Sequence, residues 1–162
     1  MRGPEHGLLT AQWTDADYRT MGWHDATVWA FTVERADWDL INARLNPEAR
    51  LLLDLDYITR WVWPGLRKGP YSFWVTPCTL AFRAVSALSV TIDPRADVGS
   101  MVISSIQRVD DRWHIEGHDV EMTFTADSFR QTARRIPVLT RAQSLGLDER
   151  GGYSYDETPV DL

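Results

Sequence analysis

The most apolar stretch of the chain, residues 51–63 (LLLDLDYITRWVW), has the alternation of a β-strand. Successive side chains of a strand point to opposite faces of a sheet. One face of this stretch would therefore be wholly apolar, while the other would carry Asp54 and Asp56 among apolar neighbours. We expect a central strand with one side in the core and a pair of carboxylates on the other side.

Shorter alternating segments, separated by turn residues, follow through much of the chain. They predict strands at 24–34, 71–75, 79–85, 88–93, 101–109, 113–116 and 120–126. Caps and helical spacing predict short helices at 14–22 and 128–136, and a short helix or structured loop at 36–49. The expected fold is α+β: a predominantly antiparallel sheet of about seven strands, sandwich-like or strongly curved, with two or three short helices.

Length and charge narrow the class of protein. A chain of 162 residues predicts a single domain over 1–162, with a loose lead-in at 1–9 and a frayed tail at 157–162. A net charge of −6 argues against broad affinity for nucleic acid. The single cysteine, Cys78, and the absence of a signal peptide or a long apolar run predict a cytoplasmic protein that does not bind membranes.

Three segments in the first half resemble a family of small bacterial proteins of unknown function. They are the HDA at 24–26, the LLLDLDYITRW of the central strand and the FWVTPCTLAF that follows it, and they cover roughly residues 23–92. In that family a His-Asp pair precedes an LDIDYI..W strand and a PATLVF segment; an Arg-Gly-Gly at 150–152 is a weaker match. The resemblance implies a β-rich fold and no particular activity. In composition the chain is also similar to some toxin-immunity proteins, which are small, acidic and β-rich.

One candidate site combines His24 and Asp25 with Asp54 and Asp56. Histidine and carboxylates together can perform acid–base catalysis, and His24, Asp54 and Asp56 could hold a divalent metal. The competing interpretation is structural. Asp54 and Asp56 would pair with arginines, and His24 and Asp25 would cap or hydrogen-bond the chain where the strand begins. Cys78 is expected to be a buried, inert thiol, and His114 and His118 are expected to lie in a hairpin without a metal.

A second candidate site consists of aromatic residues on both sides of the basic turn 64–70 (PGLRKGP). These are Trp61, Trp63, Tyr71, Phe73 and Trp74. Aromatic side chains gathered around a basic loop are typical of a recognition surface or a dimer interface. A third candidate, for anion binding, consists of Arg130, Arg134 and Arg135; these could instead pair with Asp54 and Asp56 or be solvated.

The leading functional hypothesis is a non-catalytic cytoplasmic protein that binds a protein partner, or itself, through the aromatic hairpin. Toxin immunity would be one form of this function. The alternative is a small metal-dependent enzyme or ligand-binding domain that uses the His/Asp site. Neither a P-loop nor a dinucleotide fingerprint nor a zinc motif occurs in the sequence. We therefore expect no cofactor and no nucleic-acid partner.

Overall fold

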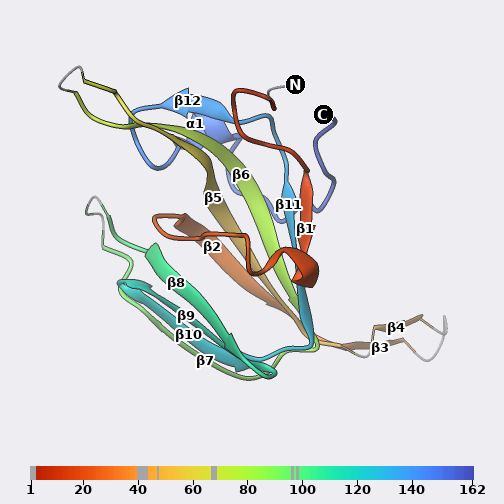
Figure 1. Ribbon diagram of the computed structural model, residues 1–162. Coiled ribbons are helices and arrows are strands. Elements are labelled where there is room, and N and C mark those ends of the chain that lie inside the picture. Colours follow the sequence, from red (N-terminus) through yellow and green to blue (C-terminus); the bar gives the residue numbers. More distant parts are fainter. Residues whose placement is uncertain (1–2, 40–43, 47, 67–68, 96, 98) are drawn as a thin grey trace.

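The computed structural model describes residues 3–39, 44–46, 48–66, 69–95, 97 and 99–162. Within these residues, one antiparallel sheet has the strand order β1-β11-β6-β5-β2-β8-β9-β10-β7, with β12 paired to β6, and β3 and β4 form a separate hairpin (Figure 1). The strands are β1 (Gln12–Thr14), β2 (Thr27–Glu34), β3 (Asp37–Asp39), β4 (Arg44–Asn46), β5 (Arg50–Val62), β6 (Ser72–Arg83), β7 (Ser86–Ile92), β8 (Val102–Val109), β9 (Arg112–His118), β10 (Val120–Thr125), β11 (Ser128–Ala133) and β12 (Val138–Thr140). The described helices are the 3-10 turn η1 (Asp15–Asp17) and α1 (Leu147–Arg150).

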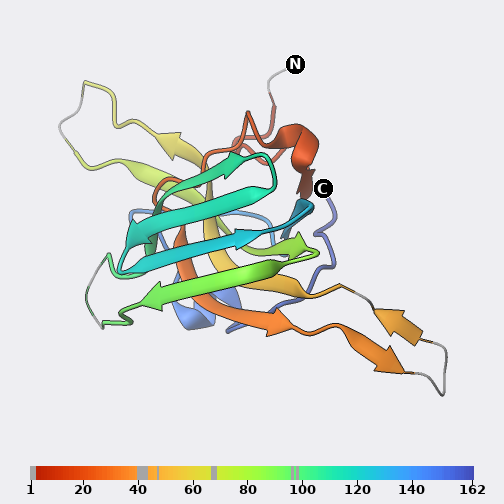
Figure 2. The ribbon, with the colours of Figure 1, turned by 90° about the horizontal axis from the view of Figure 1, so that it is seen from below.

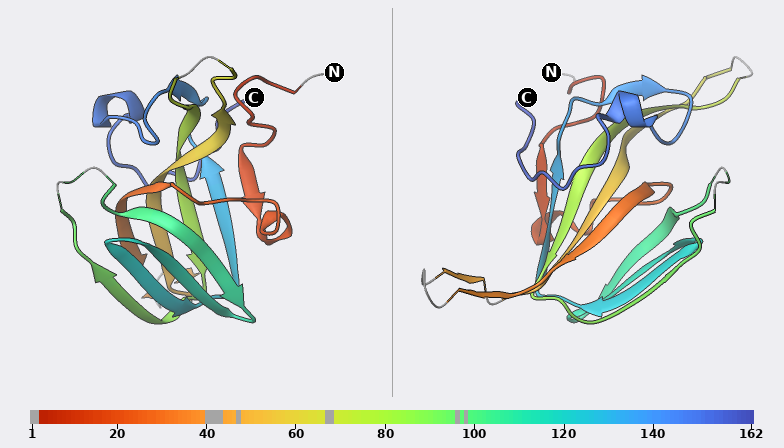
Figure 3. Two further views of the ribbon diagram at one scale, coloured as in Figure 1. Left: turned by 60° about the vertical axis from the view of Figure 1, so that its left-hand side comes forward. Right: turned by 180° about the vertical axis from the view of Figure 1, so that it is seen from behind.

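The sheet folds over on itself between β2 and β8. These strands are joined only where Thr27 pairs with Val102, so the remainder of each strand diverges from the other. Figures 2 and 3 show the resulting two layers, with β8, β9, β10 and β7 facing β6, β5 and β2. The main core lies between the layers and contains Leu53 and Phe82 from one layer and Trp113, Ile115 and Met122 from the other.

Strand β5 is the central strand that its sequence predicts, paired to β2 on one side and to β6 on the other. Leu51, Leu53 and Leu55 on one face are fully buried in the main core. The opposite face carries Asp54 and Asp56, and the C-terminal segment 134–157 covers it (Figure 1). The expected pairing of an apolar face with a carboxylate face is therefore confirmed.

The α+β class is wrong, because the described chain is almost entirely antiparallel strand, and the expected number of about seven strands is too low. Residues 128–136, predicted as a helix, contain β11. Phe129 and Ala133 are spaced for either structure, but β6 needs a partner at this edge, and Ser128–Ala133 pairs with it from Arg83 to Cys78. Tertiary pairing overrides the local helical pattern here.

The other two predicted helices are also wrong. The helix expected at 14–22 is reduced to η1, because the Asp15 carboxylate accepts the Phe129 N–H at 2.8 Å and an Arg108 guanidinium N–H at 3.1 Å. Residues 36–49, expected to form a short helix or structured loop, contain β3 and β4; positions 40–43 and 47 of that prediction lie outside the described residues.

Both ends of the chain contact the folded body. Leu8 is buried in the main core, within the segment expected to be a loose lead-in. Near the other end, the Val160 N–H donates to the Ala133 carbonyl at 2.9 Å, and Glu157 forms an ion pair with Arg50 at 2.8 Å. Among the described residues, no helix has both the length and the apolar character that crossing a bilayer would require.

Candidate functional site

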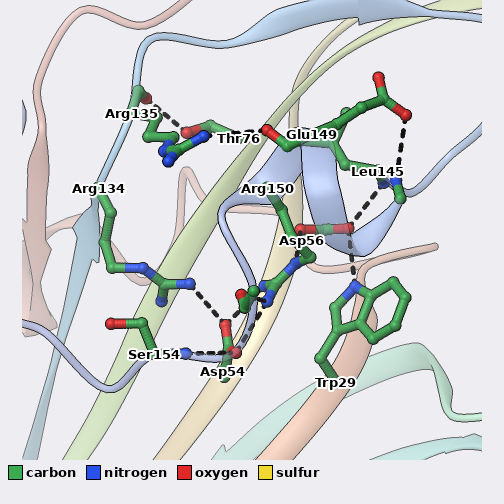
Figure 4. Close-up of polar contacts among 12 residues, drawn as sticks. Trp29, Asp54, Asp56, Thr76, Arg134, Arg135, Leu145, Glu149, Arg150 and Ser154 are labelled. Atoms are coloured by element: carbon green, nitrogen blue, oxygen red, sulfur yellow. Dashed lines mark hydrogen bonds and ion pairs between the residues drawn. The ribbon is translucent and has the colours of Figure 1, made fainter.

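Asp54 and Asp56 lie in a closed ion-pair cluster between β5 and the C-terminal segment (Figure 4). Arg150, the last residue of α1, reaches both carboxylates, with Nη2 at 2.6 Å and Nη1 at 2.9 Å from the two Asp54 oxygens and Nε at 3.1 Å from Asp56. A second guanidinium, from Arg134 just after β11, lies 2.7 Å from Asp54. The side chains of Asp54, Asp56 and Arg150 are all 0% exposed.

Neutral groups satisfy the remaining acceptor positions of the two carboxylates. Asp56 accepts the Trp29 indole N–H at 2.9 Å and the Leu145 backbone N–H at 2.8 Å. Asp54 accepts the Ser154 backbone N–H at 3.0 Å. Each of the four carboxylate oxygens thus accepts at least one hydrogen bond, and the two negative charges are matched by two guanidinium groups.

The electrostatics of Arg150 favour a permanently charged side chain. Burial lowers the pKa of its guanidinium, but the hydrogen bonds to Asp54 and the charges of both carboxylates outweigh this, and the net pKa is raised. Its guanidinium also lies 5.1 Å from the centre of the Trp29 ring, a cation–π arrangement. The cluster therefore fastens the C-terminal segment to the sheet and offers no unoccupied carboxylate oxygen to a metal ion or a substrate.

The sequence did not identify Arg150. Two features of the sequence point toward it: Gly-Gly follows Arg150, and two carboxylates that face inward require a cation nearby. Nothing in the pattern distinguishes Arg150 among 17 basic residues. Arg134 was one of the three arginines proposed to bind an anion or these carboxylates, and the structure joins it to Asp54. Gly151 is needed beside Arg150, because it has φ = 78° and the Arg135 guanidinium occupies the space of a side chain.

His24 and Asp25 lie in the turn that precedes β2 and are not joined to the carboxylate cluster by any described contact. His24 is 72% exposed and its Nδ1 lies 3.0 Å from Asp25. Asp25 accepts the Gln143 side-chain N–H at 2.9 Å, and its own backbone N–H donates to the Ile103 carbonyl at 2.8 Å. These contacts fasten the turn to β8 and to the C-terminal segment. Within the described part of the chain, no group of three or more His, Cys, Asp or Glu residues is arranged to hold a metal.

The aromatic residues near the 64–70 turn lie on the hairpin of β5 and β6, which projects beyond the sheet body (Figure 1). We call the exposed set Trp61, Trp63 and Tyr71 the aromatic patch. Their exposed fractions are 45%, 64% and 45%. The Trp61 ring lies 6.1 Å from that of Tyr71 and 4.9 Å from that of Phe73. Trp61 is therefore in contact with both Tyr71 and Phe73, and Trp63 is the most exposed member of the patch.

The base of the hairpin is packed. A small second core of Ile58, Phe73, Val75 and Leu145 lies below the aromatic patch. Trp74 alternates to the opposite face, where its ring lies 6.3 Å edge-on to that of His6. Of the five aromatic residues singled out in the sequence, three form the patch, Phe73 supports it and Trp74 lies apart from it.

The remaining candidates are separated from one another. Arg130 is exposed on β11, and Arg135 donates to the Glu149 carbonyl at 3.1 Å. His118 lies at the β9–β10 turn, where its Nε2 is 3.3 Å from Asp119, and His114 approaches Glu121 at the same distance. The two histidines thus have different acidic neighbours.

Cys78 is fully buried on β6, and burial raises the pKa of its thiol. We expect the folded protein to resist a maleimide reagent at pH 8, because the thiolate form is suppressed and the reagent has no access. Labelling should become complete when the chain is unfolded in guanidinium. Mass spectrometry measures both; rapid labelling of the folded protein at pH 8 would contradict the buried position.

No model of a known protein family, no curated protein and no solved structure matches this chain.

Proposed function

We propose that the protein is a non-catalytic binding protein that recognises a protein partner through the aromatic patch. The observation that carries this proposal is the exposure of Trp61, Trp63 and Tyr71 on the hairpin of β5 and β6, which projects beyond the sheet body (Figure 1). Large exposed aromatic side chains are unusual on a surface without a partner and are enriched at the centres of interfaces. Leu66, in the turn of the same hairpin, is 99% exposed and extends the apolar surface.

The support beneath the patch favours binding. Phe73 and Leu145 are 7% and 2% exposed and hold the base of the hairpin in one arrangement. Rigid side chains lose little conformational entropy when a partner covers them, so a supported patch binds more tightly than a mobile one. Arg67 and Lys68, in the sequence of the hairpin turn, add positive charge. A partner surface that is apolar with an acidic rim would fit these groups.

The alternative, an enzyme or metal-binding domain built on His24, Asp25, Asp54 and Asp56, has less support. Catalysis or ligation requires a carboxylate oxygen that can be reached, and the oxygens of Asp54 and Asp56 are enclosed by Arg150 and its neighbours. We place the binding protein in the cytoplasm, where its lone thiol stays reduced. Toxin immunity is one form of this proposal, and it predicts that the partner is a toxin encoded next to this gene.

The test begins by finding the partner. A photo-crosslinking amino acid is placed at position 63 in the full-length protein in its native cells, and the crosslinked protein is identified by mass spectrometry. The same residue at position 153 is the control, since Tyr153 is 60% exposed and its ring lies 6.2 Å from that of Trp29 on β2. We expect one protein to be captured from position 63 and not from position 153.

Affinity for the purified partner then measures the contribution of the patch. Replacing Trp63 with alanine should raise the dissociation constant by about 30-fold, the effect of a hot-spot aromatic residue. Tyr153→Ala should change it by less than about threefold, and circular dichroism should show both variants folded. Equal affinities of Trp63→Ala and the unmodified protein would reject the aromatic patch as the binding surface.

A further inference from the structure

Strand β7 ends the sheet, and none of the described residues pairs with its outer edge. Its sequence, SALSVTI, contains no charged residue and no proline. Free strand edges can pair with other chains, so proteins usually protect them with lysines, prolines, bulges or covering loops. The start of β7 has a register shift between Ser86 and Ser89, but from Ser89 to Ile92 the strand is regular and has neither lysine nor proline.

The edge of β8, by contrast, is covered. The Tyr18 hydroxyl accepts the Arg108 backbone N–H at 3.0 Å and donates to the Ile106 carbonyl at 3.2 Å. Further along β8, the Ile103 carbonyl accepts the Asp25 N–H at 2.8 Å. At the far end of the sheet, β1 is only 3 residues long. Of these edges, β7 is the one whose length and composition suit a further strand.

The hydrogen-bonding direction of each β7 residue follows from its pairing with β10. The Asp93 N–H donates to the Asp119 carbonyl, at the point where Ile92 pairs with Val120. Because backbone groups alternate in direction along a strand, Thr91 and Ser89 also face β10. Val90 and Ile92 therefore direct their N–H and C=O groups to the open edge. The register shift between Ser86 and Ser89, with Ala87 at φ = 51°, interrupts this alternation before Leu88.

We propose that two copies of this chain pair through β7, antiparallel and about a two-fold axis at Val90. Val90 then faces Val90 of the second copy, and Ile92 lies toward the start of the second β7, near Leu88. These side chains belong to the inner face, where Leu88, Val90 and Ile92 already pack on the main core. On the outer face Ser89 meets Thr91, two exposed hydroxyl-bearing residues. A two-fold interface must be complementary to itself, and this register satisfies that condition.

Neighbouring registers and charges support this axis. An axis at Ser89 would set Ile92 opposite Ser86 and lose an apolar pair. With the axis at Val90, Asp93, which forms an ion pair with Arg95 at 2.6 Å, lies opposite Ala87. No like charges then meet directly across the two strands.

The oligomeric state of the full chain is the first test. Sedimentation velocity over a range of concentrations should show a monomer–dimer equilibrium. Val90→Pro removes an N–H that makes no bond to the part of the chain that the structure describes, so the variant should stay folded. Each copy donates its Val90 N–H to the other copy, so the dimer of the proline variant loses two hydrogen bonds. The dimer dissociation constant should therefore rise by about 30-fold. Val90→Ala, which shortens the side chain but keeps the N–H, should be affected less.

Disulfide trapping tests the register. Ser89→Cys and Thr91→Cys are prepared separately, mixed and oxidised; the native Cys78 is buried and does not compete. The mixture should form covalent dimers, while neither variant alone should. A monomer at all concentrations, equal dimerisation of Val90→Pro and Val90→Ala, or crosslinking of Ser89→Cys alone would overturn the proposal. Trp63→Ala should leave the dimer intact, so this proposal and the proposed function can fail independently.

Discussion

Replacing Arg150 with alanine should lower the free energy of unfolding by about 3–5 kcal/mol, as measured by urea denaturation. The variant leaves the Asp56 carboxylate without its guanidinium partner and Asp54 with Arg134 alone, and both carboxylates are fully buried. An uncompensated buried charge is far more costly than the loss of a surface ion pair. Stabilities of globular domains are about 5–15 kcal/mol, so the variant would lose a large fraction of its total.

Arg83→Ala is the matched control for Arg150→Ala. Arg83 also forms an ion pair with an acidic residue, Glu48 at 3.1 Å, but its side chain is 59% exposed. Its loss should change the free energy by at most about 1 kcal/mol. Arg150→Ala should also increase amide exchange in residues 141–157, because the segment loses its attachment to the sheet. If Arg150→Ala lowered the free energy of unfolding by less than about 1 kcal/mol, the cluster would not be what holds the C-terminal segment on the sheet.

The face pattern of β5 was readable from the sequence because a strand imposes a strict two-residue alternation. Leu53 and Asp54 could be assigned to opposite faces with no knowledge of the partners. The identity of what covers Asp54 was not readable. Arg150 lies 96 residues away along the chain, and the sequence does not encode which distant cation fills a given site.

The wrong helices share one physical cause. In residues 128–133 the apolar positions Phe129 and Ala133 fit both a helix and a strand, and local propensity cannot decide between them. The decision is made by Cys78 to Arg83 on β6, whose backbone groups need a partner along that edge. At η1 the contact from elsewhere in the chain is a side-chain one, because the Asp15 carboxylate accepts the Phe129 backbone N–H.

The aromatic patch illustrates the reverse situation. Its members were found from their position around a turn, and exposure then separated Trp61, Trp63 and Tyr71 from the supporting Phe73. Sequence composition could not make that division, because Trp113 is equally aromatic and almost completely buried. Tryptophan content therefore reflects two distinct environments in this chain, the core and the exposed aromatic patch that we propose as a binding surface.

Trp113→Ala should also lower the free energy of unfolding by about 3–5 kcal/mol, because it empties a large part of the contact between the two layers. Trp113 on β9 lies 5.0 Å from the Phe82 ring on β6 and 5.7 Å from the Phe129 ring on β11. Its indole N–H donates to the Ala126 carbonyl at 3.3 Å, and Arg108 lies 4.9 Å above its ring.

Trp61→Ala provides the contrast, since it deletes the same side chain from a position that is 45% exposed. We expect Trp61→Ala to cost less than about 1 kcal/mol, because exposed surface substitutions away from structural features have small effects. Urea unfolding monitored by far-UV circular dichroism measures both variants without relying on tryptophan fluorescence. Similar losses in the two variants would mean that the packing of β9 against β6 and β11 does not hold the layers together. A large loss confined to Trp113→Ala would instead assign stability to the inner tryptophan and leave the aromatic patch available for binding.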